Sequence, residues 1–200
     1  MKKIAVLASG SGSNFEAIVH AQKRKTFNAQ VALLICDKKD AFCRARADRL
    51  KVKNIFIDPN DYSSRENFDV AVVDILKKEK IDLVVLAGYM RILSPAFIHT
   101  FKNKIINIHP ALLPAFKGSR AIKDAFDYGV KLTGVTVHFV DEEIDHGPIV
   151  LQGVVVVKKG ITIKNLEAAI HQLEHRLYPQ AIKLILEGKV SIEGRRVQIK

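Results

Sequence analysis

The sequence predicts an α/β fold: a mostly parallel, Rossmann-like sheet with helices on both faces and an antiparallel C-terminal extension. Two observations carry this prediction. Up to residue 109, short and almost continuously apolar segments alternate with segments of helical periodicity, which is typical of a parallel sheet buried on both faces. After residue 130, two β-rich segments flank a polar loop, as the strands of an antiparallel pair do. No linker interrupts the pattern, so residues 1–200 are expected to form a single domain.

The first part of the chain supplies five expected strands and three expected helices. Each strand is a short apolar run, and each helix repeats its apolar side chains at helical spacing. In the longest of these helices, Phe68, Val72 and Leu76 share one face. The expected strands are 3–8, 30–36, 53–57, 83–87 and 104–109. The expected helices are 15–24, 41–50 and 64–78.

The pattern then changes to helix followed by paired strands. Residues 121–128 form an expected helix, and Gly129 directly after it is a typical C-cap. The β-rich segments 133–140 and 149–157 flank the loop 141–148, which predicts two antiparallel strands.

A long helix and a short hairpin are expected at the C-terminus. Residues 161–186 have helical periodicity, and Gly188 marks the end of the helix. Pro179 lies inside it and is expected to kink or interrupt it, because proline lacks an N–H group and clashes with the preceding turn. Residues 190–199 are expected to form a small hairpin.

Composition and charge narrow the possible partners. The formal net charge is +11, but the Lys and Arg residues are scattered and no aromatic residues alternate with them to stack on bases. This favours an anionic small-molecule substrate over nucleic acid.

No apolar run reaches the roughly 20 residues of a membrane span, and the apolar stretch 4–8 is too short for a signal peptide. A cytosolic protein without membrane contact is therefore expected. Cys36 and Cys43 are interpreted as reduced structural thiols.

A glycine-rich loop, residues 10–14 (GSGSN), lies between the first strand and the first helix. Glycines there let the backbone approach an anion at the helix N-terminus, and Ser13 or Asn14 could cap the helix. Phe15 occupies the third glycine position of the dinucleotide fingerprint, which argues against a dinucleotide although Asp37 could serve as its ribose-binding acid. A phosphate monoester, a dinucleotide and a purely structural turn stay open.

Two polar side chains follow one another on a single face at the end of the fifth strand. Asn107 and His109 are two positions apart, and ligands of open α/β sheets bind at the carboxyl ends of strands. A structural and a functional role for this pair are both open. Asp145 lies in the acidic loop 141–145, and an acid from this loop that turned inward could orient His109. Spacing alone does not say which acid does so.

Six segments in order resemble the glycinamide ribonucleotide formyltransferase family of de novo purine synthesis, and together they run through nearly the whole chain. The segments are 9–14 (SGSGSN), 86–93 (LAGYMRIL), 107–114 (NIHPALLP), 134–140 (GVTVHFV), 145–149 (DHGPI) and 174–179 (EHRLYP).

The resemblance implies transfer of a formyl group from the co-substrate 10-formyltetrahydrofolate to the amine of glycinamide ribonucleotide. It implies a catalytic set of Asn107, His109 and Asp145. Asn107 and His109 would donate hydrogen bonds to the formyl oxygen, and Asp145 would hold His109 and help to shuttle the proton. Neither a covalent enzyme intermediate, a tightly bound cofactor nor a metal is expected.

The resemblance also implies substrate-binding residues. The substrate phosphate would rest on Gly12, Ser13 and Asn14, with Glu174 at the glycinamide end. The folate would contact Arg65, Met90, Arg91, Ile92, Leu93, Asn107, Asp141 and Ile144. Arg65 could equally be a solvated surface residue. His138 would support the site, although a packed strand histidine is an equal alternative.

The sequence departs from the family pattern after Pro114. Many members carry Pro-Gly and a His-rich stretch there, whereas this chain reads AFKGSR over residues 115–120. The resemblance therefore assigns this loop no contacts with either substrate.

Three alternative functions were weighed. Methionyl-tRNA formyltransferase adds a C-terminal tRNA-binding domain, for which the chain is too short. Formyltetrahydrofolate deformylase adds an N-terminal regulatory domain and uses water as acceptor. A non-catalytic nucleotide-binding module would not need Asn107, His109 and Asp145. A monomer or a homodimer is expected.

Overall fold

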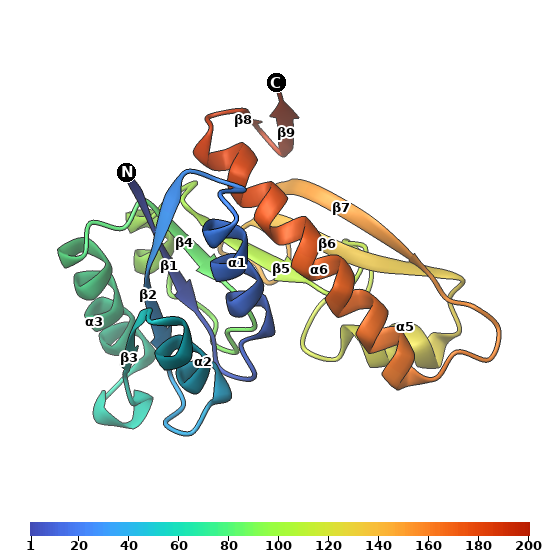
Figure 1. The fold of residues 1–200 in the computed structure, drawn as a ribbon, viewed down its shortest axis with the longest axis horizontal. Helices are drawn as coiled ribbons and strands as arrows, with labels where there is room; N and C mark the ends of the chain where they lie inside the picture. The colour runs from blue at the N-terminus through green and yellow to red at the C-terminus, as the bar shows by residue number, and fades with distance from the viewer. The chain divides into compact units, whose positions relative to one another are not determined.

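The computed structural model describes all 200 residues. It divides into two compact units, residues 1–106 and 107–200, each described by itself below (Figure 1). No helix in it combines the length and the apolar character needed to cross a membrane.

The first unit is a parallel α/β arrangement. Its strands pair in the order β3-β2-β1-β4, all in parallel. In Figure 1, α3 lies on one side of these strands and α1 and α2 lie on the other. The strands are β1 (Lys2–Leu7), β2 (Ala29–Cys36), β3 (Lys53–Phe56) and β4 (Leu83–Leu86). The helices are α1 (Ser13–Lys23), α2 (Phe42–Leu50), η1 (Pro59–Asp61), α3 (Arg65–Lys78) and α4 (Pro95–Thr100).

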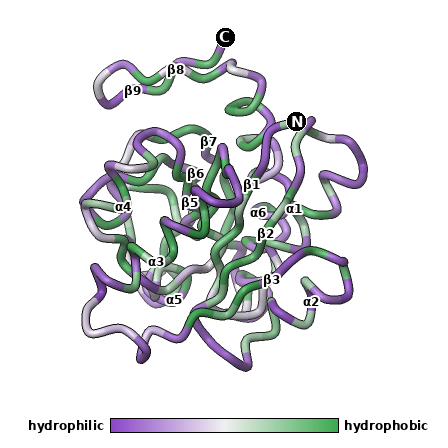
Figure 2. Tube along the Cα trace, turned by 90° about the vertical axis from the view of Figure 1, so that its left-hand side faces the viewer, coloured by the Kyte–Doolittle hydropathy of each residue, from purple (hydrophilic) through white to green (hydrophobic).

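Burial explains why the strands lie in the middle. Ile4, Val6 and Leu7 of β1 are fully buried, and the strands run as hydrophobic segments between hydrophilic turns (Figure 2). A strand that is apolar on both faces requires helices on both faces. The predicted parallel fold class is confirmed for this unit.

The start of α1 and the presence of α4 are the main differences from the predicted helices of this unit. The first helix begins at Ser13 rather than Phe15, and its N-cap is Gly12, with no side-chain cap. Ser13 and Asn14 thus lie in the first turn, and the expected side-chain cap was wrong. The short helix α4 was not predicted, although Ser94 accepts a hydrogen bond from the Phe97 amide and Pro95 occupies the first turn.

The second unit contains an antiparallel pair covered by a long helix. Strand β5 (Ile105–His109) runs through the boundary between the units. Helix α6 packs along the paired strands (Figure 1), and β8 and β9 form the expected hairpin. The remaining elements are α5 (Ala121–Tyr128), β6 (Leu132–Phe139), β7 (Ile149–Val156), α6 (Ile163–Leu186), β8 (Val190–Glu193) and β9 (Arg196–Ile199). The predicted antiparallel extension is confirmed.

Pro179 does not interrupt α6, which contradicts one part of the prediction for this residue. The helix is continuous over 24 residues with Pro179 inside it. Proline costs a helix interior about 3 kcal/mol. Helix α6 packs against β6 and β7, and the burial of its apolar side chains, which include Leu166, Ile170 and Ile182, offsets this cost.

Gly134 lets β6 and β7 approach closely. A Cβ atom at this position would lie 1.9 Å from the Gly153 carbonyl oxygen and 2.7 Å from a methyl carbon of Leu112. Neither contact is compatible with a side chain, so the pairing of the two strands depends on this glycine.

Gly134→Ala is therefore expected to reduce the free energy of unfolding by about 2–4 kcal/mol, because the strands must separate locally. Gly129→Ala is the control, since a Cβ there meets open space and only its positive φ of 79° opposes the change, at roughly 1 kcal/mol. Denaturant unfolding of both variants gives the comparison. Equal losses would contradict the role assigned to Gly134.

Candidate functional site

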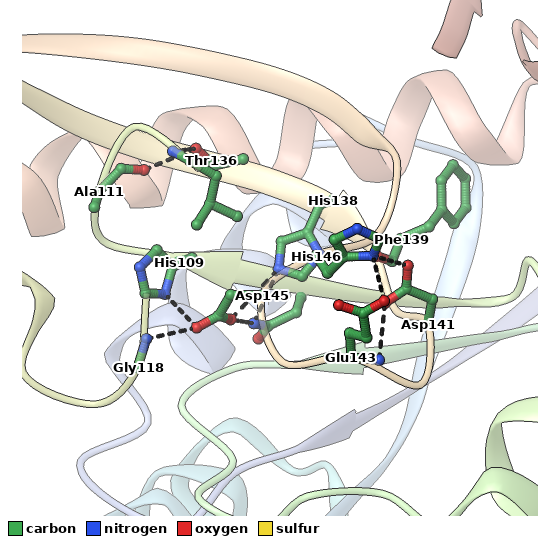
Figure 3. Close-up of polar contacts among 12 residues, drawn as sticks. His109, Ala111, Gly118, Thr136, His138, Phe139, Asp141, Glu143, Asp145 and His146 are labelled. Atoms are coloured by element: carbon green, nitrogen blue, oxygen red, sulfur yellow. Dashed lines mark hydrogen bonds and ion pairs between the residues drawn. The ribbon is translucent and has the colours of Figure 1, made fainter. Parts of the chain in front are cut away.

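Asp145 stands at the centre of a polar cluster in the second unit (Figure 3). Its Oδ2 atom lies 3.3 Å from Nδ1 of His109, and its Oδ1 atom lies 3.5 Å from Nδ2 of Asn107. The side chains of His109 and Asp145 are 4% and 10% exposed. The structure thus brings the three predicted residues together, and Asp145 is the acid of the loop that turns inward.

Backbone geometry directs these side chains. The alternation of β5 places Asn107 and His109 on one face. Asp145 itself has a left-handed backbone, with φ of 48°. A Cβ on Gly147 would lie 1.9 Å from the Phe139 carbonyl oxygen, and the Phe139 amide donates to the Pro148 carbonyl at 2.8 Å. The loop after Asp145 is therefore held closely against the end of β6.

The loop that departs from the family pattern closes over the cluster. Nε2 of His109 lies 2.8 Å from the carbonyl oxygen of Phe116, and the amide of Gly118 donates to Oδ2 of Asp145 at 2.8 Å. Both ring nitrogens of His109 thus face acceptor oxygens, and only the doubly protonated ring donates to both. An oxygen atom that replaced the Phe116 carbonyl would face Nε2 of His109.

Sequence reasoning missed Phe116 and Gly118. Both contribute backbone atoms, and both have positive φ, 51° and 94°. The glycine at 118 was the available signal, because such a backbone favours glycine.

His138 orients the amide of Asn107. Its Nδ1 donates to the Phe139 carbonyl at 2.8 Å, which leaves Nε2 as the acceptor for Nδ2 of Asn107 at 3.3 Å. Burial lowers the pKa of His138, so the neutral ring that this arrangement requires is favoured. The two contacts of the Asn107 amide are long, at 3.3 and 3.5 Å, which makes it available to a better acceptor.

The glycine loop of the first unit rests on α2. The amide of Cys43 donates to the Gly10 carbonyl at 3.0 Å, and Nε of Arg46 donates to the Ser11 carbonyl at 2.9 Å. Gly12 has φ of 74°, and a Cβ there would lie 2.5 Å from Cβ of Cys43. Gly12 is thus required by the packing of α2, and not only, as expected, by the approach of a ligand.

The start of α1 keeps the features of an anion site. No side-chain cap occupies its first amides, so these amides and the helix dipole favour a negative group there. Ser13 is half-buried and Asn14 is buried.

The predicted folate residues of the first unit differ in exposure. Met90 and Ile92 are exposed, whereas Leu93 is buried in the core. The guanidinium of Arg91 lies 4.4 Å from the ring centre of Phe68. Arg65 pairs with Glu66 at 3.2 Å on the surface.

The remaining predicted residues lie in the second unit. Ile144 is exposed, and Oδ2 of Asp141 accepts from Nδ1 of His146 at 2.7 Å. Glu174 is buried, and its Oε2 accepts from Nδ1 of His171 at 2.9 Å. This hydrogen bond raises the pKa of His171. The structure contains no group of three or more His, Cys, Asp or Glu side chains placed to hold a metal ion.

Comparison with known proteins gives a consistent result. Residues 2–182 match the family described as formyl transferase. The chain is 44% identical over 186 residues to phosphoribosylglycinamide formyltransferase of Bacillus subtilis, covering 93% of this chain and 95% of that protein. It is 42% identical to the trifunctional purine biosynthetic protein adenosine-3 of Gallus gallus, covering 95% of this chain and 19% of that protein. The solved structure of glycinamide ribonucleotide transformylase 1 from Symbiobacterium toebii is similar with a TM-score of 0.97 and 46% identity, covering 100% and 94% of the two chains.

Gly12→Ala is expected to lower the Tm by several degrees. The added Cβ overlaps Cys43, and the alanine must adopt the left-handed backbone of Gly12. Together these effects cost about 2–4 kcal/mol. Each kcal/mol lowers the Tm by roughly 2–4 °C. Calorimetry of the purified variant measures the change. Gly10→Ala is the matched control, because a Cβ at Gly10 meets nothing within 4 Å. The same Tm for both variants would show that α2 does not constrain this loop.

Proposed function

The chain belongs to the formyl transferase family, and we propose that it transfers the formyl group of 10-formyltetrahydrofolate to the amine of glycinamide ribonucleotide. The products are formylglycinamide ribonucleotide and tetrahydrofolate, within purine synthesis. The observation that carries the proposal is the Asp145 carboxylate with one oxygen directed at His109 and the other at Asn107. Sequence identity of 44% to a phosphoribosylglycinamide formyltransferase supports the choice of substrates.

The chemistry is a direct attack of the amine on the formyl carbon. A new C–N bond forms, and negative charge develops on the formyl oxygen. Nε2 of His109, released from the Phe116 carbonyl, and Nδ2 of Asn107 donate to this oxygen. Donors placed in this way contribute about 3 kcal/mol each to the transition state.

Proton transfer completes the reaction. The attacking nitrogen loses a proton, and N10 of the folate gains one as the bond from N10 to the formyl carbon breaks. Asp145 holds His109 in orientation and supports this transfer. Its carboxylate accepts a hydrogen bond from the Gly118 amide at the same time. No side chain becomes covalently attached to a substrate.

Substrate binding divides among the predicted residues. Gly12, Ser13 and Asn14 at the start of α1 would hold the phosphate, because the N-terminal amides of a helix and its dipole attract a negative group. Glu174 would bind the glycinamide end. The folate would contact Arg65, Met90, Arg91, Ile92, Leu93, Asn107, Asp141 and Ile144. The side chain of Leu93 is buried, so this residue would contribute mainly by positioning its neighbours.

Residues 1–200 would work as one formyltransferase domain, since the matched region 2–182 includes most of both compact units. A cytosolic location and a monomeric or homodimeric state stay predictions.

The purified protein is expected to form formylglycinamide ribonucleotide from glycinamide ribonucleotide and 10-formyltetrahydrofolate. Product formation is followed by mass spectrometry, beside a reaction without the amine. Methionyl-tRNA is not expected to be formylated. Formate release at the same rate without the amine would instead indicate a deformylase.

Asp145→Asn is expected to lower kcat by two or more orders of magnitude, by analogy with other sites that contain an oriented histidine. Asparagine tolerates the left-handed backbone at this position, so the variant should fold. Because Asp145 and His109 act as a unit, the double variant with His109→Ala should lose little more than either single variant.

A double-mutant cycle on kcat measures this coupling. Glu142→Gln is the control, because it removes one charge from an exposed position of the same loop and should retain activity. Additive losses from Asp145→Asn and His109→Ala would show that the two residues work independently.

A further inference from the structure

The C-terminal hairpin carries an arginine at its tip. Strands β8 and β9 pair from Val190↔Ile199 to Glu193↔Arg196, so Gly194 and Arg195 form a two-residue turn. Gly194 has φ of 59°, which suits the first central position of a type II′ turn. The hairpin also contacts β7. Arg195 is thus presented from a short turn on a supported hairpin, beyond the family match that ends at residue 182.

Arg195 binds the residue that follows Asp145. Its Nη2 donates to the carbonyl oxygen of His146 at 2.6 Å, and its Nη1 lies 2.9 Å from Nε2 of the same residue. Nδ1 of His146 lies 2.7 Å from Oδ2 of Asp141. One tautomer satisfies this arrangement: Nδ1 donates to Asp141, and Nε2 accepts from Arg195. The contact of Nη1 with Nδ1 at 3.3 Å is then a close approach rather than a second hydrogen bond.

The loop 141–148 has an inner and an outer attachment. On the inside, the Asp145 carboxylate contacts Asn107, His109 and Gly118. On the outside, Arg195 holds both the backbone and the ring of His146.

The negative charge of the loop 141–148 is a second reason why a contact with Arg195 stabilises it. The loop contains four acids within five positions, Asp141, Glu142, Glu143 and Asp145. Like charges this close repel one another, and a guanidinium beside the loop reduces that repulsion. His146 therefore has charged neighbours of both signs. Two are the acids Asp141 at 2.7 Å and Glu143 at 3.9 Å, and the third is the guanidinium of Arg195.

We infer that Arg195 is a positioning residue of this enzyme, which acts through His146 to hold the loop 141–148 in the conformation that directs Asp145 inward. The inference rests on the proposed function, because it assigns Arg195 to the formyl transfer. It predicts that the hairpin contributes to activity through the contacts of Arg195 with His146.

Arg195→Ala tests the inference, with Arg196→Ala as the matched control. Arg196 is the next residue, carries the same charge and is also exposed. Arg195→Ala removes two hydrogen bonds to His146, and we expect the loop to open roughly tenfold more readily. A glutamate-specific protease reports this opening directly, since it cleaves after Glu142 and Glu143. Cleavage should be about tenfold faster in Arg195→Ala and unchanged in Arg196→Ala.

Kinetics provide the second measurement. Arg195→Ala should lower kcat/KM for 10-formyltetrahydrofolate by roughly fivefold or more, with an unchanged KM for glycinamide ribonucleotide and an unchanged Tm. Arg195→Lys should recover part of the loss, because lysine keeps the charge but lacks the two-pronged donor. His146→Ala combined with Arg195→Ala should lose no more than His146→Ala alone.

The outcomes separate the two proposals. If the wild-type protein does not transfer formyl groups, the proposed function fails, whereas the protease assay still tests whether Arg195 holds the loop. If Arg195→Ala equals Arg196→Ala in both protease cleavage and kcat/KM, the inference about Arg195 is overturned. A lower Tm with an unchanged kcat/KM would also overturn it, because that pattern indicates a merely structural role.

Discussion

The carboxylate of Asp145 is the interaction on which the rest of the site depends. Its two oxygens contact an amide side chain, an imidazole and a backbone amide, from Asn107, His109 and Gly118. A nearly buried carboxylate needs such partners, because an unpaired charge away from water is very costly. The same contacts fix the directions of both donors that would meet the formyl oxygen. One side chain thus links β5, the loop over it and the loop between β6 and β7.

The backbone around this carboxylate is held in conformations that ordinary residues avoid. Asp145, Phe116 and Gly118 all have positive φ, and the two non-glycine residues each carry a cost of order 1 kcal/mol. Such geometry persists where the surroundings determine it. Here Gly147 packs against the Phe139 carbonyl on one side, and the Phe116 carbonyl accepts from His109 on the other. Close packing keeps Asp145 and Phe116 in these strained backbone conformations. The orientation of the hydrogen-bond donors of His109 and Asn107 depends on that packing.

The periodicity of apolar residues made the fold predictable from the sequence, whereas the backbone hydrogen bonds of the site were not predictable in this way. Apolar runs identified the five strands up to residue 109, and the two-residue spacing of Asn107 and His109 placed them on one face. Spacing did not select Asp145 from its acidic neighbours, and only the resemblance to a family did so. The contacts of the Phe116 carbonyl, the Gly118 amide and the His146 carbonyl have no signature in side-chain chemistry. Gly118 alone gave a signal, and it indicated an unusual backbone rather than the partner of its amide. At Pro179, the packing of a long helix overrode a local preference that sequence reasoning gave too much weight.

The seating of Gly12 on Cys43 has a consequence for how this sequence can vary. The glycine loop takes its shape from α2, since the missing Cβ of residue 12 leaves the space into which Cys43 fits. A substitution at either position therefore affects the space that the other can occupy. A bulkier residue at position 43 would displace the glycine loop from the side of α2. It would thereby alter the affinity for the phosphate that we propose binds there, without contacting the phosphate itself. When variants are selected for altered phosphate affinity, substitutions should therefore appear on the buried face of α2, which includes Cys43, as well as in the glycine loop itself.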